Sequence, residues 1–409
     1  MKPLVVAALV AAVLAPPPPA QADSSPSCLG RPATPVSTHH GNVVGTSGPD
    51  VIVVTDPRRI DAGAGDDLVC VSFTKHRYLK VFLGAGSDRF LGGGSDLAMM
   101  RVETGDRDDV ALGRAPSHDE VTTGGDSDEV HTGVPGFADD DVVDEGSGGD
   151  SLIISGLPVG SFTAAVPPPG QSNLLALDDP GLHAWQVDEE NGTVSIDHGT
   201  ATPLAGFTDL RLSRLTWSSL DITGTDRRDY VDAGHPAGTR GPLTARLGEG
   251  RDSIDLDGAL TGSVDLGAGT DGVLITGLHA KTFEGDLVAR LHGTWSLDGR
   301  AGVTLAGVEG MSTYGFLRAE VTGTPGRNSI SLSGCGGSVR GGGDRDLLSV
   351  EFDHGCPRMT AYSLSGGPGD DRLFGTRSRD VLVGGPGTDV ACGGGGRDTI
   401  RVERVLARC

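Results

Sequence analysis

The sequence predicts an all-β fold, a parallel β-roll or β-solenoid in which short strands alternate with tight turns rich in glycine and aspartate. Glycine supplies 66 of the 409 residues without a collagen-like period, so it serves turns. Turns that carry aspartate recur about every 20 residues, which is the length of one β-helix coil, and apolar patches follow them. Aromatic residues make up only 4% of the chain, too few for several conventional cores.

The turn pattern is most regular near the C-terminus, where four nonapeptides stand in tandem. Each approximates G-G-x-G-x-D-x-U-x with U apolar, and they span Gly366–Phe374, Gly375–Val383, Gly384–Cys392 and Gly393–Arg401. Glycines permit the positive φ angles of a tight turn and expose backbone carbonyls. The aspartate adds carboxylate oxygens, and carbonyl and carboxylate oxygens together are the ligands that Ca²⁺ prefers. The x-U-x triplet should form a short strand with one side chain pointing inward.

At these residues the chain resembles the RTX, or haemolysin-type calcium-binding repeat, family. The resemblance implies a parallel β-roll in which two nonapeptides make one coil and Ca²⁺ lies between stacked turns. Gly366–Asp371 would then face Gly384–Asp389, and Gly375–Asp380 would face Gly393–Asp398. The first pair keeps the whole motif, whereas arginines in the second pair weaken the expected site. The alternative is a Gly/Asp turn array without metal.

The candidate calcium ligands are the glycines and aspartates of these turns. In the tandem they are Gly366, Gly367, Gly369, Asp371, Asp380, Gly384, Gly385, Gly387, Asp389, Gly393, Gly394, Gly396 and Asp398. Earlier turns add Asp50, Asp67, Asp88, Asp128, Asp150, Asp252 and Asp271. From Asp67 to Asp150 the spacing, counted through Asp108, predicts one column of stacked acidic corners. Like charges about 5 Å apart repel by about 3 kcal/mol at an effective dielectric of 20, so cations or protons must relieve the column.

Composition and spacing divide the chain into seven segments. Residues 1–22 are predicted to be a signal peptide, with a basic start, an apolar run and an A-x-A site, although an uncleaved anchor is the alternative. The other segments are an N-terminal lead and cap (23–44), N-terminal solenoid repeats (45–155), duplicated and less regular solenoid modules (156–331), connecting coils (332–365), the tandem nonapeptides (366–401) and a C-terminal cap (402–409). Each duplicated module carries a tryptophan, Trp185 or Trp295, which we expect to pack inside a coil rather than to stack on a sugar.

Six cysteines in an exported chain favour disulfides. Cys335 and Cys356, like Cys392 and Cys409, are separated by about one coil, and neighbouring rungs lie within disulfide reach. Cys28 and Cys70 remain, and would tie the N-terminal cap to the first coils. The stretch from Cys28 to Cys70 is similar to secreted actinobacterial members of the RTX family, in which these two cysteine positions recur. Free buried thiols are the alternative.

The net charge of −22 argues against nucleic-acid binding, which needs a basic face, and suits a protein that takes up cations. No stretch after residue 22 is apolar for long enough to span a membrane. Neither H-E-x-x-H nor G-x-S-x-G occurs in the sequence. The sequence therefore predicts a secreted, non-enzymatic protein whose cofactor is Ca²⁺. An adhesin or carbohydrate-binding protein with a cell-surface glycan or protein partner, and a β-helix polysaccharide-degrading enzyme, are the alternatives.

Overall fold

The structure is a computed structural model of the whole chain. It describes residues 26–34, 36–39, 41–75, 77–92, 98–107, 109–113, 118–168, 171–212, 214–234, 241–257, 259–277, 284–352, 356 and 361–406. These residues form strands, turns and bends, and none of them belongs to a helix that could cross a membrane. The predicted signal peptide lies outside the described residues.

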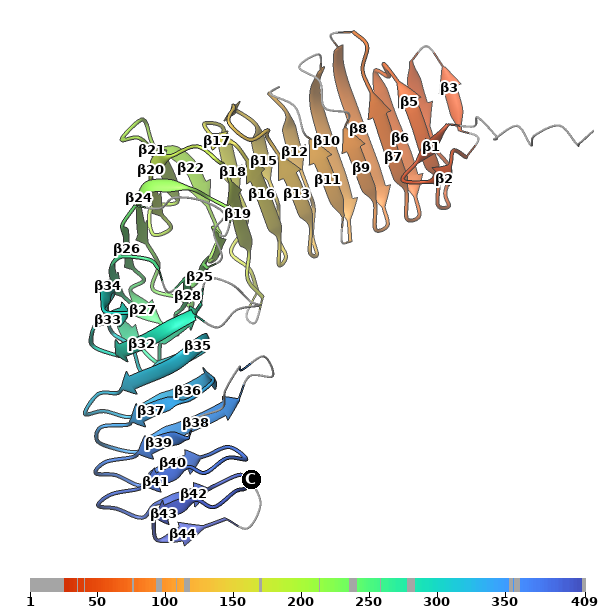
Figure 1. Cartoon of the computed structure of the whole chain (residues 1–409). Coiled ribbons are helices and arrows are strands. Elements are labelled where there is room, and N and C mark those ends of the chain that lie inside the picture. Colours follow the sequence, from red (N-terminus) through yellow and green to blue (C-terminus); the bar gives the residue numbers. More distant parts are fainter. Residues whose placement is uncertain are drawn as a thin grey trace, which may run out of the picture.

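The chain winds into a solenoid with two walls of stacked parallel strands (Figure 1), which confirms the predicted fold class. Wall A begins with β4 (Asn42–Val44), β6 (Arg59–Ala64), β8 (Arg77–Ala85), β10 (Ala98–Asp106), β12 (Glu120–Thr122), β15 (Val142–Asp144) and β18 (Ser161–Thr163). Wall B begins with β5 (Val51–Thr55), β7 (Leu68–Ser72), β9 (Arg89–Gly92), β11 (Val110–Gly113), β13 (Glu129–Thr132), β16 (Ser151–Ser155) and β19 (Leu174–Asp178).

The two walls continue to the C-terminal end of the described chain. Wall B goes on with β23 (Asp209–Arg211), β25 (Tyr230–Ala233), β28 (Ser253–Asp257), β31 (Gly272–Thr276), the first part of β35 (Gly310–Thr322), β36 (Ser329–Gly334), β38 (Leu347–Phe352), β40 (Arg372–Phe374), β42 (Val390–Cys392) and β44 (Arg404–Val405). Wall A goes on with β24 (Trp217–Thr223), β26 (Leu243–Arg246), β29 (Gly262–Asp265), the second part of β35, β37 (Gly337–Arg340), β39 (Tyr362–Ser365), β41 (Val381–Val383) and β43 (Thr399–Arg401). Strand β35 serves both walls because it turns at Gly315, whose φ is +86°.

Each duplicated module inserts an antiparallel meander into wall A. The first consists of β20 (His183–Asp188), β21 (Thr193–Ile196) and β22 (Thr202–Ala205), and the second of β32 (Glu284–Arg290), β33 (Gly293–Leu297) and β34 (Arg300–Ala306). Strand β22 pairs with β18 and β20 pairs with β24, and likewise β34 pairs with β29 and β32 with β35. The predicted duplication of less regular modules is visible as two equivalent meanders, whose antiparallel pairing was not predicted.

The meanders account for the bend of the solenoid. Where wall B passes directly from β19 to β23, wall A contains three strands instead of one, and the same holds between β31 and β35. Two additional strands lengthen wall A by about 10 Å at each module, since neighbouring strands lie about 4.8 Å apart. The solenoid therefore bends at the meanders, with wall B on the inner side (Figure 1).

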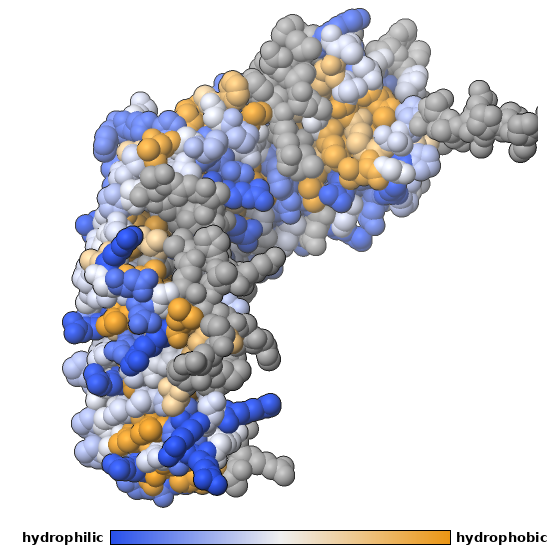
Figure 2. Space-filling view, in the orientation of Figure 1, coloured by the Kyte–Doolittle hydropathy of each residue, from blue (hydrophilic) through white to orange (hydrophobic). Residues whose placement is uncertain are grey.

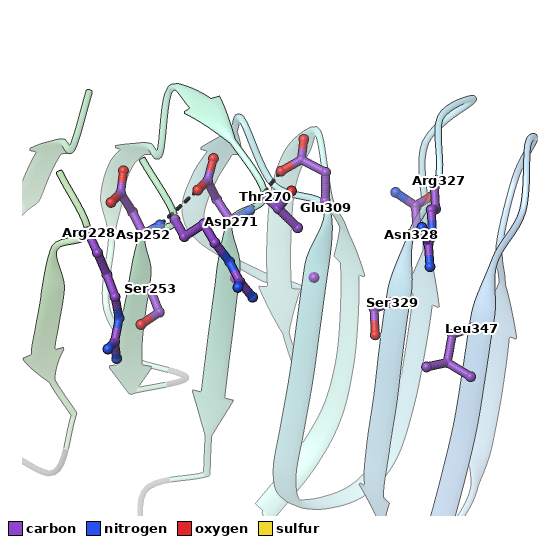
Figure 3. Close-up of a pocket in the computed structure, with 13 residues that line it drawn as sticks. Arg228, Asp252, Ser253, Thr270, Asp271, Glu309, Arg327, Asn328, Ser329 and Leu347 are labelled. Carbon is purple, nitrogen blue, oxygen red and sulfur yellow. Dashed lines mark hydrogen bonds between the residues drawn. The ribbon is translucent and has the colours of Figure 1, made fainter. Parts of the chain in front are cut away.

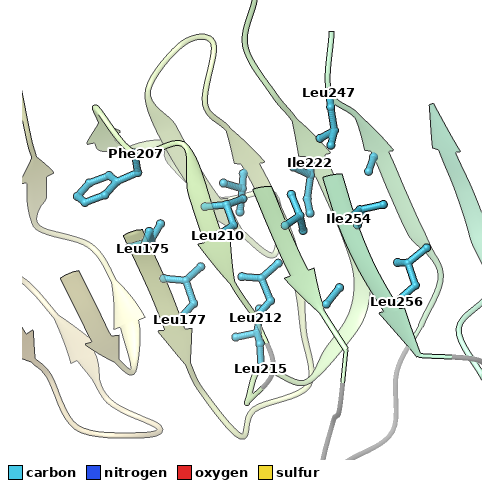
Figure 4. Close-up of a cluster of buried hydrophobic side chains, with 14 of the residues drawn as sticks. Leu175, Leu177, Phe207, Leu210, Leu212, Leu215, Ile222, Leu247, Ile254 and Leu256 are labelled. Atoms are coloured by element: carbon cyan, nitrogen blue, oxygen red, sulfur yellow. The ribbon is translucent and has the colours of Figure 1, made fainter. Parts of the chain in front are cut away.

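Apolar side chains from alternating strand positions fill the space between the walls. In β16 the burial pattern is strictly alternating, with Leu152 and Ile154 inside. In the middle of the solenoid, leucines and isoleucines of successive coils stack in rows (Figure 4). Trp185, Trp217 and Trp295 are each 0% exposed, so the predicted packing role of the module tryptophans is confirmed.

The outer surface mixes apolar and hydrophilic residues, with an apolar area over the N-terminal strands (Figure 2). Val44 on β4 and Tyr78 on β8 are exposed apolar side chains at this end. Short accessory pairs lie beside the walls: β1 (Ser27–Cys28) with β2 (Arg31–Pro32), β3 (Ser37–His39) with β4, β14 (Ala138–Asp139) with β17 (Leu157–Pro158), and β27 (Glu249–Gly250) with β30 (Ala268–Gly269).

Two of the predicted disulfides are confirmed. Cys28 is bonded to Cys70, with their Cα atoms 5.8 Å apart, and joins the N-terminal cap to β7. Cys335 is bonded to Cys356, with a Cα separation of 5.3 Å. The third predicted pair involves Cys409, which lies outside the described residues.

Candidate metal-binding corners

Most aspartates of the Gly/Asp turns line up in one column, at the corners that lead from wall A into wall B. Each backbone N–H donates to the Oδ1 atom of the aspartate one coil further on: Asp67 to Asp88 at 2.8 Å, and Asp252 to Asp271 at 2.8 Å. We call this series the aspartate ladder. Its members are Asp50, Asp67, Asp88, Asp109, Asp128 and Asp150, then Asp229, Asp252 and Asp271, and then Asn328, Asp346, Asp371 and Asp389.

The tandem nonapeptides stack in the predicted register. Strand β40 pairs with β42, and the N–H of Asp371 donates to Asp389 Oδ1 at 2.9 Å. On the opposite side, β41 pairs with β43, and the N–H of Asp380 donates to Asp398 Oδ1 at 3.0 Å. The two expected pairs of facing corners are therefore confirmed, one on each side of the solenoid.

Glycine is sterically required where these corners stack. A Cβ atom on Gly366 would lie 2.0 Å from Asp371 Oδ2, and one on Gly384 would lie 2.0 Å from Asp389 Oδ2. A Cβ atom on Gly385 would lie 2.1 Å from the carbonyl oxygen of Gly367. Carboxylate and carbonyl oxygens thus lie so close to these glycines that a larger residue at the same positions would clash with them.

Many ladder carboxylates keep one oxygen without a hydrogen bond. While Oδ1 accepts from the preceding coil, Oδ2 is buried and lacks a partner among the described residues at Asp67, Asp88, Asp150, Asp252, Asp271, Asp346, Asp371 and Asp389. Burial, together with neighbouring ladder carboxylates, raises the pKa of Asp67, Asp252 and Asp346 to about 7, against the lowering effect of the ladder hydrogen bond. A buried anion without compensation is costly, so these oxygens call for a cation or a proton.

A second, shorter column lies at the corners that lead from wall B into wall A. The N–H of Asp119 donates to Asp141 Oδ1 at 2.7 Å, and Asp139 lies beside them. Burial, followed by repulsion from Asp139 and Asp119, raises the pKa of Asp141 to about 9. Asp380 and Asp398 form the C-terminal part of this column.

Several residues of the two columns were not predicted from the sequence. The count through Asp108 was wrong, because Asp109 takes the ladder position by accepting the Asp88 N–H at 2.8 Å; Asp108 itself lies outside the described residues. Asp108 and Asp109 are adjacent and fit the spacing of the turns equally well, so the sequence alone does not show which of them takes the ladder position. Asp229 and Asp346 belong to turns that are recognisable in the sequence, but they were not among the predicted calcium ligands. Glu309 accepts the Asp271 N–H at 3.0 Å from a shortened corner, which has no Gly/Asp signature.

Two glutamates also bury their carboxyl groups close to the ladder. Both carboxylate oxygens of Glu145, and both of Glu189, lack a partner among the described residues. Burial, together with Asp150 and Asp128, raises the pKa of Glu145 to about 9. Glu189 lies next to a second shortened corner, at residues 206–208. Burial and the charge of Asp229 raise the pKa of Glu189 as well.

The donor set suits a cation held largely by backbone oxygens. Within the described residues, no group of three or more His, Cys, Asp and Glu side chains is arranged to hold a metal ion. A metal ion at the corners would thus need carbonyl oxygens beside one or two carboxylates. Ca²⁺ accepts such a mixed set of six to eight oxygens, whereas Zn²⁺ prefers nitrogen and sulfur in a four-coordinate site.

A separate hollow of about 780 Å³ lies along the edge of wall B at the bend (Figure 3). Arg228, Arg251 and Arg327 line it, together with the hydroxyl groups of Ser253 and Ser329. Ladder carboxylates and Glu309 lie at one side of it (Figure 3). Guanidinium groups and hydroxyls in one hollow can hydrogen-bond an anionic polar ligand.

Residues 365–400 match the family described as the RTX calcium-binding nonapeptide repeat, in four copies. The match thus covers the tandem corners and confirms the resemblance found there. No curated protein matches the chain.

Proposed function

We propose that this chain is a secreted, non-enzymatic calcium-binding β-solenoid protein, in which Ca²⁺ bound between stacked Gly/Asp corners stabilises the fold. The observation that carries the proposal is the buried, unpartnered Oδ2 of Asp371 and Asp389, in two adjacent corners that match calcium-binding repeats. These aspartates and the carbonyl groups of their corner glycines would hold the ion. Ca²⁺ supplies the positive charge that relieves repulsion along the column.

Calcium that binds only the folded chain stabilises it by mass action. We therefore expect millimolar Ca²⁺ to raise the unfolding temperature and to increase or stabilise the β-structure signal. The measurement is a calcium titration followed by circular dichroism and calorimetry. The double variant Asp371→Ala/Asp389→Ala should show a clearly smaller calcium response than the unchanged protein.

The matched control is Asp370→Ala, next to Asp371. Its carboxylate is on the exposed side of the corner, where it accepts the Thr388 N–H at 2.8 Å. This variant should keep the calcium response. If the unchanged protein shows no response to millimolar Ca²⁺, the proposed function is wrong.

Export and the lack of catalysis are parts of the same proposal. The A-x-A segment and the disulfides support an oxidising, extracellular setting. Free Ca²⁺ is abundant enough there to fill sites with dissociation constants of about 10⁻⁴–10⁻³ M. We propose no catalytic role, because neither H-E-x-x-H nor G-x-S-x-G occurs in the sequence and the stacked corners favour a structural use of the carboxylates.

The hollow at the bend favours a second candidate function, binding of an anionic polysaccharide. It gathers three arginines on a chain whose net charge is −22. We expect the double variant Arg228→Gln/Arg251→Gln to bind a uronic-acid polymer about tenfold more weakly, the effect of losing about 1.4 kcal/mol. Arg300→Gln, at an exposed residue of β34, is the control. Equal binding of neutral and acidic glycans would argue against this candidate.

A further inference from the structure

Two kinds of corner occur in the ladder, and they differ at the second residue. In open corners this residue is glycine, as in Gly366–Asp371, and outside the Asp128 corner the aspartate Oδ2 has no partner within the described chain. In closed corners it is threonine, as in Gly45–Asp50, Gly224–Asp229 and Gly323–Asn328. There the threonine N–H donates to the side chain of the last corner residue: to Asp50 Oδ2 and Asp229 Oδ2 at 2.6 Å, and to Asn328 Oδ1 at 2.7 Å.

The backbone explains the difference. Glycine at the second position adopts positive φ in every open corner except that of Asp128, for example +113° at Gly367 and +131° at Gly385. The Gly367 N–H then donates to the Gly384 carbonyl of the next coil at 2.8 Å, and so does not reach Asp371. A β-branched residue avoids positive φ, and none of the corner threonines is among the described residues with positive φ. Their N–H groups point instead at the carboxylate of their own corner.

Closed corners do not need a charge. Asn328 occupies the aspartate position of the third closed corner, and its N–H donates to Asp346 Oδ1 at 2.7 Å as an aspartate would. Thr225 also donates its hydroxyl to Asp229 Oδ1 at 2.9 Å. In the second column, Thr376 closes the corner of Asp380 in the same way, with N–H and hydroxyl contacts of 2.6 and 2.8 Å.

Closed corners stand where the ladder begins anew. The corner of Asp50 is the first of the ladder, and those of Asp229 and Asn328 follow the shortened corners at residues 206–208 and 307–309. Each run of open corners ends on a different side chain that accepts the last aspartate N–H: Asn173 at 3.0 Å, Glu309 at 3.0 Å and Glu403 at 2.8 Å. The first corner of a run has no preceding ladder corner with which to share a cation, whereas the last corner faces the side chain that accepts its aspartate N–H.

We propose that the solenoid holds three separate runs of calcium sites, each started by a threonine-closed corner that binds no ion. This inference rests on the proposed function. The runs comprise Asp67, Asp88, Asp109, Asp128 and Asp150; Asp252 and Asp271; and Asp346, Asp371 and Asp389. Asp128 is the least open member, because the Gly124 N–H reaches its Oδ2 at 3.3 Å. Only the third run overlaps the residues that match the RTX repeat.

The assignment changes two of the sequence-based candidates. Asp50 and Asp380 were selected as metal ligands from their spacing, but their Oδ2 atoms accept hydrogen bonds within their own corners. We therefore remove both from the calcium sites. Asp67, Asp88, Asp252 and Asp271 remain, although they lie far from the matched repeats.

The test is calcium stoichiometry of the whole protein, measured by equilibrium dialysis with metal analysis. Asp88→Asn keeps the ladder acceptor but removes the charge, and should bind fewer ions than the unchanged protein. Asp50→Asn should bind the same number, since Asn328 shows that a closed corner tolerates an amide. Thr46→Gly turns the sequence of the corner into G-G-S-G-P-D and should add one ion.

Thr46→Val is the matched control for Thr46→Gly, because it removes the hydroxyl but keeps a β-branched residue and its N–H. It should add no ion. If Thr46→Gly does not fold, Thr225→Gly poses the same question at the start of the second run. The inference is overturned if Asp88→Asn and Asp50→Asn lose ions equally, or if neither glycine variant gains one. Calcium loss in Asp371→Asn alone would also overturn the inference, because binding would then be confined to the third run. No calcium binding by the unchanged protein would overturn the proposed function itself.

Discussion

Asp67, Asp252 and Asp346 lose hydration when the chain folds, and burial raises the pKa of each carboxyl group from 3.8 to about 7. A pKa that is higher in the folded state means that protons favour folding. Without Ca²⁺, this stabilisation is fully present below pH 4 and is lost as the pH rises through 7. We expect the calcium-free protein to unfold at a lower temperature at pH 8 than at pH 5.

Calcium should weaken or reverse this pH dependence, since it replaces the proton at the same oxygens. Thermal unfolding in chelator and in millimolar Ca²⁺, at both pH values, checks the expectation. If the calcium-free protein becomes more stable between pH 5 and pH 8, the ladder carboxylates are not the groups that determine the pH dependence of its stability.

The short strands β40 and β41 of the tandem each have one buried side chain between two more exposed neighbours. On β41, Leu382 is 0% exposed, whereas Val381 is 38% exposed. Leu382→Ala should therefore lower the free energy of unfolding by about 2–5 kcal/mol, the usual effect of a cavity in a packed core. Val381→Ala, one residue away, should cost less than about 1 kcal/mol. Urea unfolding at a fixed calcium concentration makes the comparison, and equal losses would mean that the strand is in another register.

In the whole molecule, the two walls differ in length because only wall A receives the meanders. The same two modules shorten the corners at residues 206–208 and 307–309, so the bend and the breaks in the ladder arise together. The solenoid is thus one continuous stack of strands, but its acidic corners are divided into runs. The hollow with Arg228 and Arg251 lies at the second module, where the inner wall passes from β31 to β35.

The parallel solenoid, the facing corners around Asp371 and Asp389, and two disulfides could all be predicted from the sequence. They depend on local chemistry: glycine allows the turn, aspartate follows it, and one apolar residue per short strand points inward. Three features could not be predicted from the sequence: the order of strands in the meanders, the choice of Asp109 over Asp108, and the place of Glu309 in the ladder. Each depends on which distant strands pair and in which register, and only the folded chain brings those partners to within hydrogen-bonding distance of one another.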